Sequence, residues 1–191
     1  MIITIGRECG CAGDEIGLKL AEMYDLKFMA KLEITTLAKE KGIYDEYPMF
    51  FGEEPMDQLV SSISEDNKDK IHETPYKVLS QLIDDNCVIV GRASRIAYED
   101  KENAVNVFLC GDMDSRISRI AKKHGVSEHK AKVIVDETDV RRRDYNNYYS
   151  YNNWDNASSY DICINMTRSG VDGAVELIAS YIKLRFGEKV L

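Results

Sequence analysis

The chain has 191 residues, of which 44% are hydrophobic and 30% charged, and its formal net charge is −8. This length fits one domain, residues 1–191, and the apolar fraction is sufficient for a core. The acidic balance argues against non-specific binding to nucleic acid, whereas a small anionic ligand needs only a local basic pocket. No apolar run reaches about 18 residues, so we expect neither a membrane-spanning helix nor a membrane partner.

The five cysteines do not suggest a disulfide framework. Their number is odd and several lie in apolar runs, which is typical of free thiols in a reducing compartment. Cys9 and Cys11 alone are too close together and too few for a zinc site. Residues 1–5 carry no basic leader and are expected to form a first strand rather than a signal peptide. These features favour a cytoplasmic location.

Short apolar, β-branched runs predict strands at residues 2–5, 87–90, 105–109 and 162–164. Such continuous apolar runs are typical of strands that are buried on both faces of a parallel sheet. Amphipathic patterns predict helices over residues 15–24, 76–83, 115–124 and 171–184. The alternation of the two predicts a doubly wound α/β sheet with right-handed crossovers.

Two polar stretches interrupt this alternation. Residues 44–70 contain Pro48 and Pro55 beside Phe50 and Phe51, and we expect an excursion above the sheet with one short helix. Residues 145–160 are rich in Asn and Tyr and are interpreted as a loop or lid, with the lid segment beginning at residue 141. Two ordinary surface loops remain the alternative. The lid's aromatic residues suit base stacking or lid packing, and their composition also leaves a homodimer interface open.

A glycine-rich turn, residues 6–17, follows the first strand and opens the first helix. Glycines let the backbone curl so that several N–H groups point at one anion, and the helix dipole adds partial positive charge. The turn is therefore predicted to bind phosphate, although a plain tight connection is the alternative. The candidate phosphate-binding residues are Gly6, Gly10, Cys11, Ala12, Gly13, Asp14 and Glu15.

The turn lacks the lysine of the pattern G-x-x-x-x-G-K-[ST]. Gly13 falls in the lysine position and Asp14 near the Ser/Thr position. Arg7, at the entrance of the turn, is the candidate for the missing positive charge. Asp14 and Glu15 suit the dipole of an empty helix, but they would repel a phosphate unless they point away or hold Mg²⁺.

Other arginines have both a functional and a structural interpretation. Arg92 directly follows a buried strand, which favours a role in a pocket. Arg116 and Arg119 share a helix face, where pairing with nearby carboxylates as surface salt bridges is the alternative. Arg141 and Arg142 belong to a run of three arginines, which is also typical of the solvated end of a long helix. The three histidines show no metal-ligand spacing, and no metal site is expected apart from Mg²⁺ bound with a nucleotide.

Several blocks of the sequence resemble the cytidylate kinase-like family. They cover nearly the whole chain except residues 44–70. The blocks are residues 3–8, 15–17, 19–22, 88–92, 116–120, 125–128, 139–145, 148–149, 160–165 and 170–175. The resemblance implies a three-layer P-loop NTPase-like fold with a central parallel sheet, helices on both faces and a lid.

The same resemblance implies phosphoryl transfer from ATP, with Mg²⁺, to a nucleoside monophosphate such as CMP or dCMP. It places Arg92 at the acceptor's phosphate. The arginines implied to neutralise the transferring phosphate are Arg116, Arg119, Arg141 and Arg142, and Arg7 joins them as the loop's own cation. The chain departs from the family at Asp14, where members often carry a basic residue, and at Ala30, where an aspartate is common.

Two functions of different classes follow. The first is a nucleoside monophosphate kinase that acts on CMP, dCMP or a related acceptor. The second is a noncatalytic nucleotide- or phosphate-binding protein on the same fold, because the phosphate loop lacks its lysine. A third, weaker hypothesis is a kinase for another small acceptor, since residues 44–70 match the family least.

Overall fold

The computed structural model describes residues 1–52 and 68–187. Its centre is a five-stranded, all-parallel sheet with strand order β2-β3-β1-β4-β5. The strands are β1 (Ile2–Arg7), β2 (Lys27–Met29), β3 (Cys87–Val90), β4 (Ala104–Cys110) and β5 (Ile162–Asn165). The four predicted strands are confirmed. The fifth, β2, is a three-residue edge strand, which is too short to show a periodic pattern.

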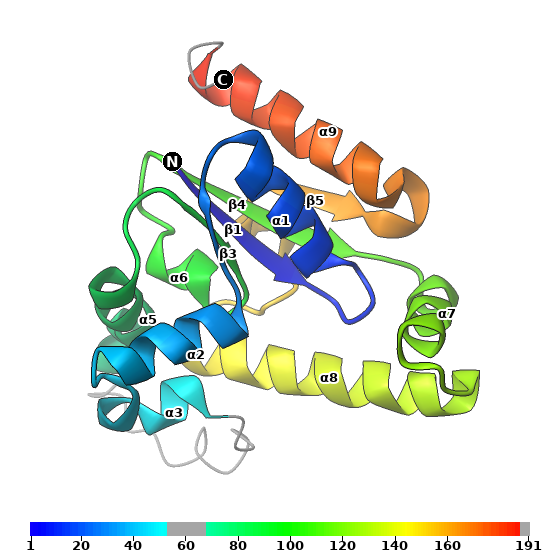
Figure 1. Cartoon of the computed structure of the whole chain (residues 1–191), viewed down its shortest axis with the longest axis horizontal. Helices are drawn as coiled ribbons and strands as arrows, with labels where there is room; N and C mark the ends of the chain where they lie inside the picture. The colour runs from blue at the N-terminus through cyan, green and yellow to red at the C-terminus, as the bar shows by residue number, and fades with distance from the viewer. Residues whose placement is uncertain (53–67, 188–191) are drawn as a thin grey trace.

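Helices cover both faces of this sheet (Figure 1). On one face, Ile3 and Ile5 of β1 pack among side chains of α1 (Gly13–Met23) and α9 (Met166–Phe186). On the other face, Ile2 packs among side chains of α2 (Lys31–Glu40), α5 (Lys68–Leu82) and α6 (Ser94–Ala97). Because successive strand residues point to opposite faces, one short apolar run supplies both cores. The three-layer P-loop NTPase-like fold class is thereby confirmed.

Two further helices are α7 (Met113–His124) and α8 (Glu128–Tyr149), which pack against each other. From α7, α8 runs along one side of the molecule toward α3 (Figure 1). A small apolar cluster joins Ile117 and Ile120 of α7, Ala131 and Val135 of α8, and Cys9 from the turn after β1. The cluster holds both helices against the turn that was predicted to bind phosphate.

The structure corrects the interpretation of residues 145–149 as an irregular loop. They form the last turns of α8, a helix of 22 residues. The only buried residues of α8 are Ala131, Val135, Asp139 and Tyr149, so the helix has almost no apolar stripe by which the sequence could reveal it. Beyond it, the short helix η3 (Ala157–Ser159) leads into β5.

The candidate acceptor segment, residues 44–70, is described only in part. It contains η1 (Tyr44–Glu46) and α3 (Pro48–Phe51), and its end from residue 68 begins α5. Phe50 and Phe51 are buried in the core beside α2 and α5, which anchors α3 to the body of the protein. The remainder, residues 53–67, lies outside the described residues.

In the described part of the chain, no helix combines the length and the apolar character needed to cross a bilayer.

Candidate phosphoryl-transfer site

The turn between β1 and α1 leaves several backbone N–H groups without an acceptor. Gly10 has φ of 89° and Ala12, the N-cap residue of α1, has φ of 54°, so the chain curls through left-handed conformations. Among the described residues, nothing accepts a hydrogen bond from the N–H groups of Gly10, Ala12, Gly13, Asp14 or Glu15. Unpaired N–H groups at a helix N-terminus form a binding site for an anion.

Arg7 lies across this turn. A Cβ at Gly13 would lie 2.9 Å from Cγ of Arg7, and a Cβ at Gly91 would lie 2.3 Å from its Nη1. The arginine therefore occupies the space that the missing side chains of these two glycines leave open. Within the described residues, its guanidinium donates no hydrogen bond and has no carboxylate within ion-pair distance.

The electrostatic environment of Arg7 is unfavourable for a cation. Burial, together with the nearby charges of Arg142 and Arg92, lowers its pKa to about 9, while Asp14 opposes this shift. The guanidinium still carries its charge at neutral pH. A half-buried cation that faces two other cations and has no paired carboxylate is suited to receive an anion.

Arg142 reaches the same place from α8. Its Nη1 donates to the backbone oxygen of Arg7 at 3.1 Å. Arg141 and Arg143, its neighbours in sequence, are exposed, and Arg141 donates weakly to Thr138. The helical arrangement thus brings one member of the arginine run into the site and leaves the other two on the surface.

Arg92 follows β3, as expected, in an unusual backbone conformation. Gly91, Arg92 and Ala93 all have positive φ, of 78°, 58° and 51°. Three successive left-handed residues are costly and are found mainly at functional sites. The Nη1 group of Arg92 donates to the backbone oxygen of Phe50 at 3.0 Å, so the guanidinium points toward α3.

Tyr145 of α8 shares this contact with Arg92. Its hydroxyl donates to the same Phe50 oxygen at 2.9 Å, and the Arg92 guanidinium lies 5.9 Å from the centre of its ring. Burial raises the pKa of Tyr145, so the hydroxyl remains a donor. The Phe50 carbonyl of α3 thereby bridges Tyr145 of α8 and Arg92, the residue that was predicted to bind the phosphate of the acceptor substrate.

Arg116 does not face open space. Its side chain is 6% exposed, and it donates to the backbone oxygens of Gly111 at 3.0 Å and Cys9 at 3.2 Å. Burial opposes its charge, yet Asp139 and Glu8 outweigh this effect and raise its pKa. Arg119 lies further along α7, half-exposed, 3.6 Å from Glu15. Arg116 thus contacts Asp139 and the glycine-rich turn, whereas Arg119 forms an exposed ion pair with Glu15, the kind of contact that the structural alternative expected.

Asp139 and Glu8 were missed as site residues by the sequence analysis. Oδ1 of Asp139 accepts the Cys9 N–H at 2.6 Å, and Oε2 of Glu8 accepts the Gly111 N–H at 2.9 Å. Both residues lie within blocks that carry the family resemblance, at residues 3–8 and 139–145. Their type and spacing alone did not distinguish them from surface carboxylates.

The remaining phosphate-loop candidates are divided between interior and surface. Cys11 is buried, and burial raises the pKa of its thiol to about 12. A Cβ at Gly6 would meet Phe108 and Tyr160 at 3.1 Å. Asp14 and Glu15 are exposed at the first turn of α1.

The carboxylates near the glycine-rich turn are compatible with Mg²⁺ that is bound together with a nucleotide. The described residues contain no cluster of three or more His, Cys, Asp or Glu side chains that could hold an ion by themselves. Mg²⁺ usually needs only one or two carboxylates beside phosphate oxygens and water. Asp14 and Glu15 are the carboxylates at the start of α1 that could take this part.

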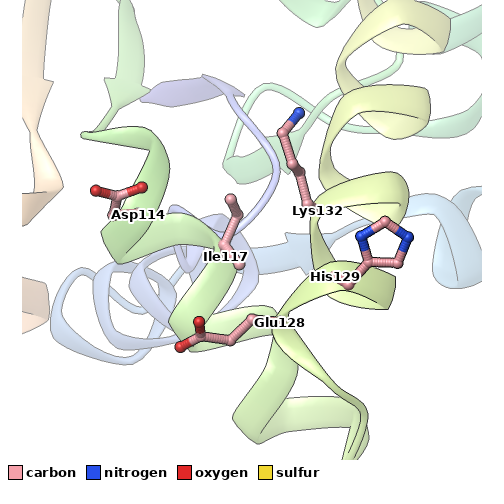
Figure 2. A pocket seen from close by; sticks show the side chains of 5 residues that line it. All are labelled: Asp114, Ile117, Glu128, His129 and Lys132. Atoms are coloured by element: carbon pink, nitrogen blue, oxygen red, sulfur yellow. The ribbon is translucent and has the colours of Figure 1, made fainter.

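Beside a wide surface cavity of about 730 Å³ that includes Ser118 and Lys122, two smaller cavities lie near α7. The first, of about 270 Å³, is lined by Asp114, Ile117, Glu128, His129 and Lys132. Figure 2 shows that the charged groups there point in different directions, and Lys132 is paired with Asp136 at 2.5 Å, so they do not form one ligand site. The second, of about 70 Å³, opens beside the phosphate loop. It is lined by Gly10, Gly111, Ser115, Arg116, Arg119, Met166, Thr167 and Gly170.

The aromatic cluster that suggested a homodimer is mostly internal. Tyr149 is 3% exposed and Trp154 is 4% exposed, and Trp154 packs edge-on against Phe108 of β4. Tyr151 is the exposed member, at 59%. The structure thus removes much of the aromatic surface on which the dimer hypothesis depended.

The chain is similar in sequence to known cytidylate kinases. The chain is 27% identical to a cytidylate kinase of Archaeoglobus fulgidus, over 97% of this chain and 96% of that one. It is 25% identical to a cytidylate kinase of Pyrococcus horikoshii, over 95% and 88% of the two chains.

Solved structures share the fold. An uncharacterised protein from Eubacterium ventriosum is 28% identical with a TM-score of 0.72, and the match covers 96% of this chain and 98% of that one. A gluconokinase from Sinorhizobium meliloti, at 12% identity and a TM-score of 0.51 over 96% and 92% of the two chains, shares the fold alone. The model of the cytidylate kinase-like family matches residues 2–168, and the chain belongs to that family.

Proposed function

We propose that this protein is an ATP-dependent phosphotransferase whose acceptor is a nucleoside monophosphate, CMP, dCMP or a close relative. The observation that carries the proposal is the Arg7 guanidinium. It lies among two other arginines and beside unpaired loop N–H groups, and no carboxylate of residues 1–52 or 68–187 is within ion-pair distance of it. Membership of the cytidylate kinase-like family suggests phosphoryl transfer as the reaction. The arginines of this chain would supply the positive charge that neutralises the phosphates.

In the proposed reaction, the bond between the γ-phosphorus of ATP and its bridging oxygen breaks. A phosphate oxygen of the acceptor forms the new bond, so that ADP and a nucleoside diphosphate leave. Such a transfer needs positioning and neutralisation of the phosphate oxygens more than covalent help. Mg²⁺, when bound with the nucleotide, would supply part of that neutralisation.

Each arginine has a distinct part in this proposal. Arg7 replaces the loop lysine, and Arg142 brings a second charge from α8. Arg92 is assigned to the acceptor's phosphate, since its contacts with α3 use only Nη1 of its five N–H donors. Arg119 and Arg141 are exposed and are assigned supporting positions around the phosphates.

The test is ADP release from ATP and Mg²⁺ with each common nucleoside monophosphate. We expect turnover with at least one pyrimidine monophosphate, and a fall of at least about a hundredfold in Arg7→Ala, since removing one charge-stabilising donor typically costs this much. Arg143→Ala, an exposed neighbour of Arg142, is the control and should retain activity. A folded wild-type protein without turnover on any monophosphate would refute the kinase proposal.

A second candidate is a noncatalytic nucleotide- or phosphate-binding protein on the same fold. It is favoured by Gly13, which stands where a lysine would contact the phosphates. Calorimetric binding of ATP without turnover would support it. A cytoplasmic location is proposed for either function, because all five cysteines are free thiols.

A further inference from the structure

We propose that Asp139 and Arg116 are a pair of positioning residues that fix the phosphate loop before an anion binds. The inference rests on the proposed function of that loop. Neither residue is assigned to touch the substrate. They act through Cys9, the loop residue that precedes the unpaired N–H groups.

Both polar groups of the Cys9 backbone are held. Its N–H donates to Oδ1 of Asp139 at 2.6 Å, and its carbonyl accepts from Nη1 of Arg116 at 3.2 Å. The same Nη1 lies 2.5 Å from Oδ2 of Asp139, which closes a ring of contacts around one residue. Asp139 is 8% exposed and Arg116 6%, so water competes little for these bonds.

The next residue, Gly10, has no space for a side chain. A Cβ at Gly10 would lie 2.8 to 2.9 Å from backbone atoms of Arg116, because the loop passes directly against α7. Glu8, on the other side of Cys9, lies 3.5 Å from Nε of Arg116 and accepts the Gly111 N–H. Three consecutive loop residues are therefore held against α7 and the end of β4.

The pair also connects the loop to the helix that carries Arg142. Asp139 and Arg142 are three residues apart on α8, so they share one face, and both contact the segment at residues 7–9. The Cys9 N–H, bound by Asp139, is directed away from any ligand. The N–H groups of Gly10, Ala12, Gly13, Asp14 and Glu15 remain for the anion, in a backbone that needs little reorganisation.

A purely structural ion pair would have a different signature. Loss of a structural pair lowers stability and leaves the ligand affinity of the folded protein unchanged. Loss of a positioning pair weakens the binding of phosphate groups in the protein that remains folded. The binding of phosphate groups by folded protein is therefore the decisive measurement, and it does not require turnover.

The experiment uses Asp139→Asn, which keeps size and an acceptor but removes the charge that Arg116 needs. Its control is Asp136→Asn, the same substitution one turn earlier on α8 in an exposed pair with Lys132. The dissociation constant of inorganic pyrophosphate is measured by calorimetry below the melting temperature of each variant. We expect a rise of about tenfold or more in Asp139→Asn, and no change in Asp136→Asn.

A second variant, Arg116→Lys, covers the case in which Asp139→Asn does not fold. It retains the charge but loses the fork that reaches Cys9 and Asp139 together, and a rise in the same constant is expected. Unchanged pyrophosphate affinity in a folded variant would overturn the positioning role and leave the proposed function intact. A wild-type protein that binds no pyrophosphate would overturn both.

Discussion

Arg7 is the residue that we propose supplies positive charge to the glycine-rich turn in place of a lysine. The guanidinium lies over Gly13 and Gly91, two positions where any larger side chain would collide with it. Its charge is destabilised by burial and by Arg142 and Arg92. This unfavourable environment in the free protein is what the proposed anion site would require.

The substitution Arg7→Met should therefore separate stability from binding. It removes a cation from an unfavourable environment, so the free energy of unfolding without ligand should rise by about 1 kcal/mol. The pyrophosphate dissociation constant should rise by at least about tenfold. Denaturant unfolding and calorimetry measure the two effects, with Arg143→Met as the control. A stability loss with unchanged affinity would contradict this account of Arg7.

Gly91 gives a second prediction at the residue scale. Gly91→Ala places a Cβ 2.3 Å from Nη1 of Arg7, whereas Gly125→Ala places one with no atom within 4 Å. Both positions have positive φ, of 78° and 63°, so each substitution should destabilise the fold by about 1 kcal/mol. Only Gly91→Ala should also weaken pyrophosphate binding, measured by calorimetry. Equal binding losses in both variants would mean that backbone strain, not displacement of Arg7, is responsible.

At the scale of elements, α8 connects the two substrate sides of the proposed site. Its Asp139 and Arg142 contact the segment at residues 7–9, and one turn later Tyr145 contacts Phe50 of α3. The first part of the predicted lid segment, residues 141–149, therefore belongs to the packed helix α8 and is not a free loop. We expect any closing motion in this region to involve α8 together with α3.

Tyr145→Phe tests this connection. It deletes the hydroxyl that donates to the Phe50 oxygen at 2.9 Å and keeps the ring that packs near Phe50. The KM for the monophosphate should rise roughly threefold to tenfold, as expected for one lost hydrogen bond, while the KM for ATP stays unchanged. Steady-state kinetics provides the measurement, and Tyr148→Phe on the same helix is the control. A rise in the KM for ATP alone would contradict this prediction, because it would mean that Tyr145 supports ATP binding and not acceptor binding.

At the scale of the whole molecule, the net charge of −8 contrasts with the local cluster of Arg7, Arg92 and Arg142. The acidic surface discourages non-specific association with polyanions, while the cluster offers charge only where the loop N–H groups converge. This distribution favours a small phosphorylated ligand over a nucleic acid.

Binding of such a ligand should stabilise the whole domain. At a concentration of about 100 times its dissociation constant, pyrophosphate should add roughly 2.7 kcal/mol, which corresponds to a rise in Tm of roughly 5–10 °C for a domain of this size. The shift with ATP should shrink when EDTA removes Mg²⁺. Thermal-shift measurements with nitrate as the control anion check both effects. Identical shifts with nitrate and pyrophosphate would indicate a general salt effect instead of a site.

The sequence by itself determined the sheet, the helices with strong apolar stripes, and the position of the glycine-rich turn that is proposed to bind phosphate. Those features depend on local patterns, such as the apolar runs of β1 and β3 and the glycine-rich turn after β1. Resemblance to a family pointed to the arginines but did not distinguish Arg142, which enters the site, from Arg141, which stays on the surface.

Only the tertiary structure decided which side chains meet. Asp139 lies 130 residues from Cys9 along the chain, and Arg142 lies 135 residues from Arg7. Helix α8 itself buries too few apolar residues for its pattern to show, and its position depends on packing against α7 and α3. Contacts of such long separation arise from the packing of elements, for which local propensity and periodicity carry no information.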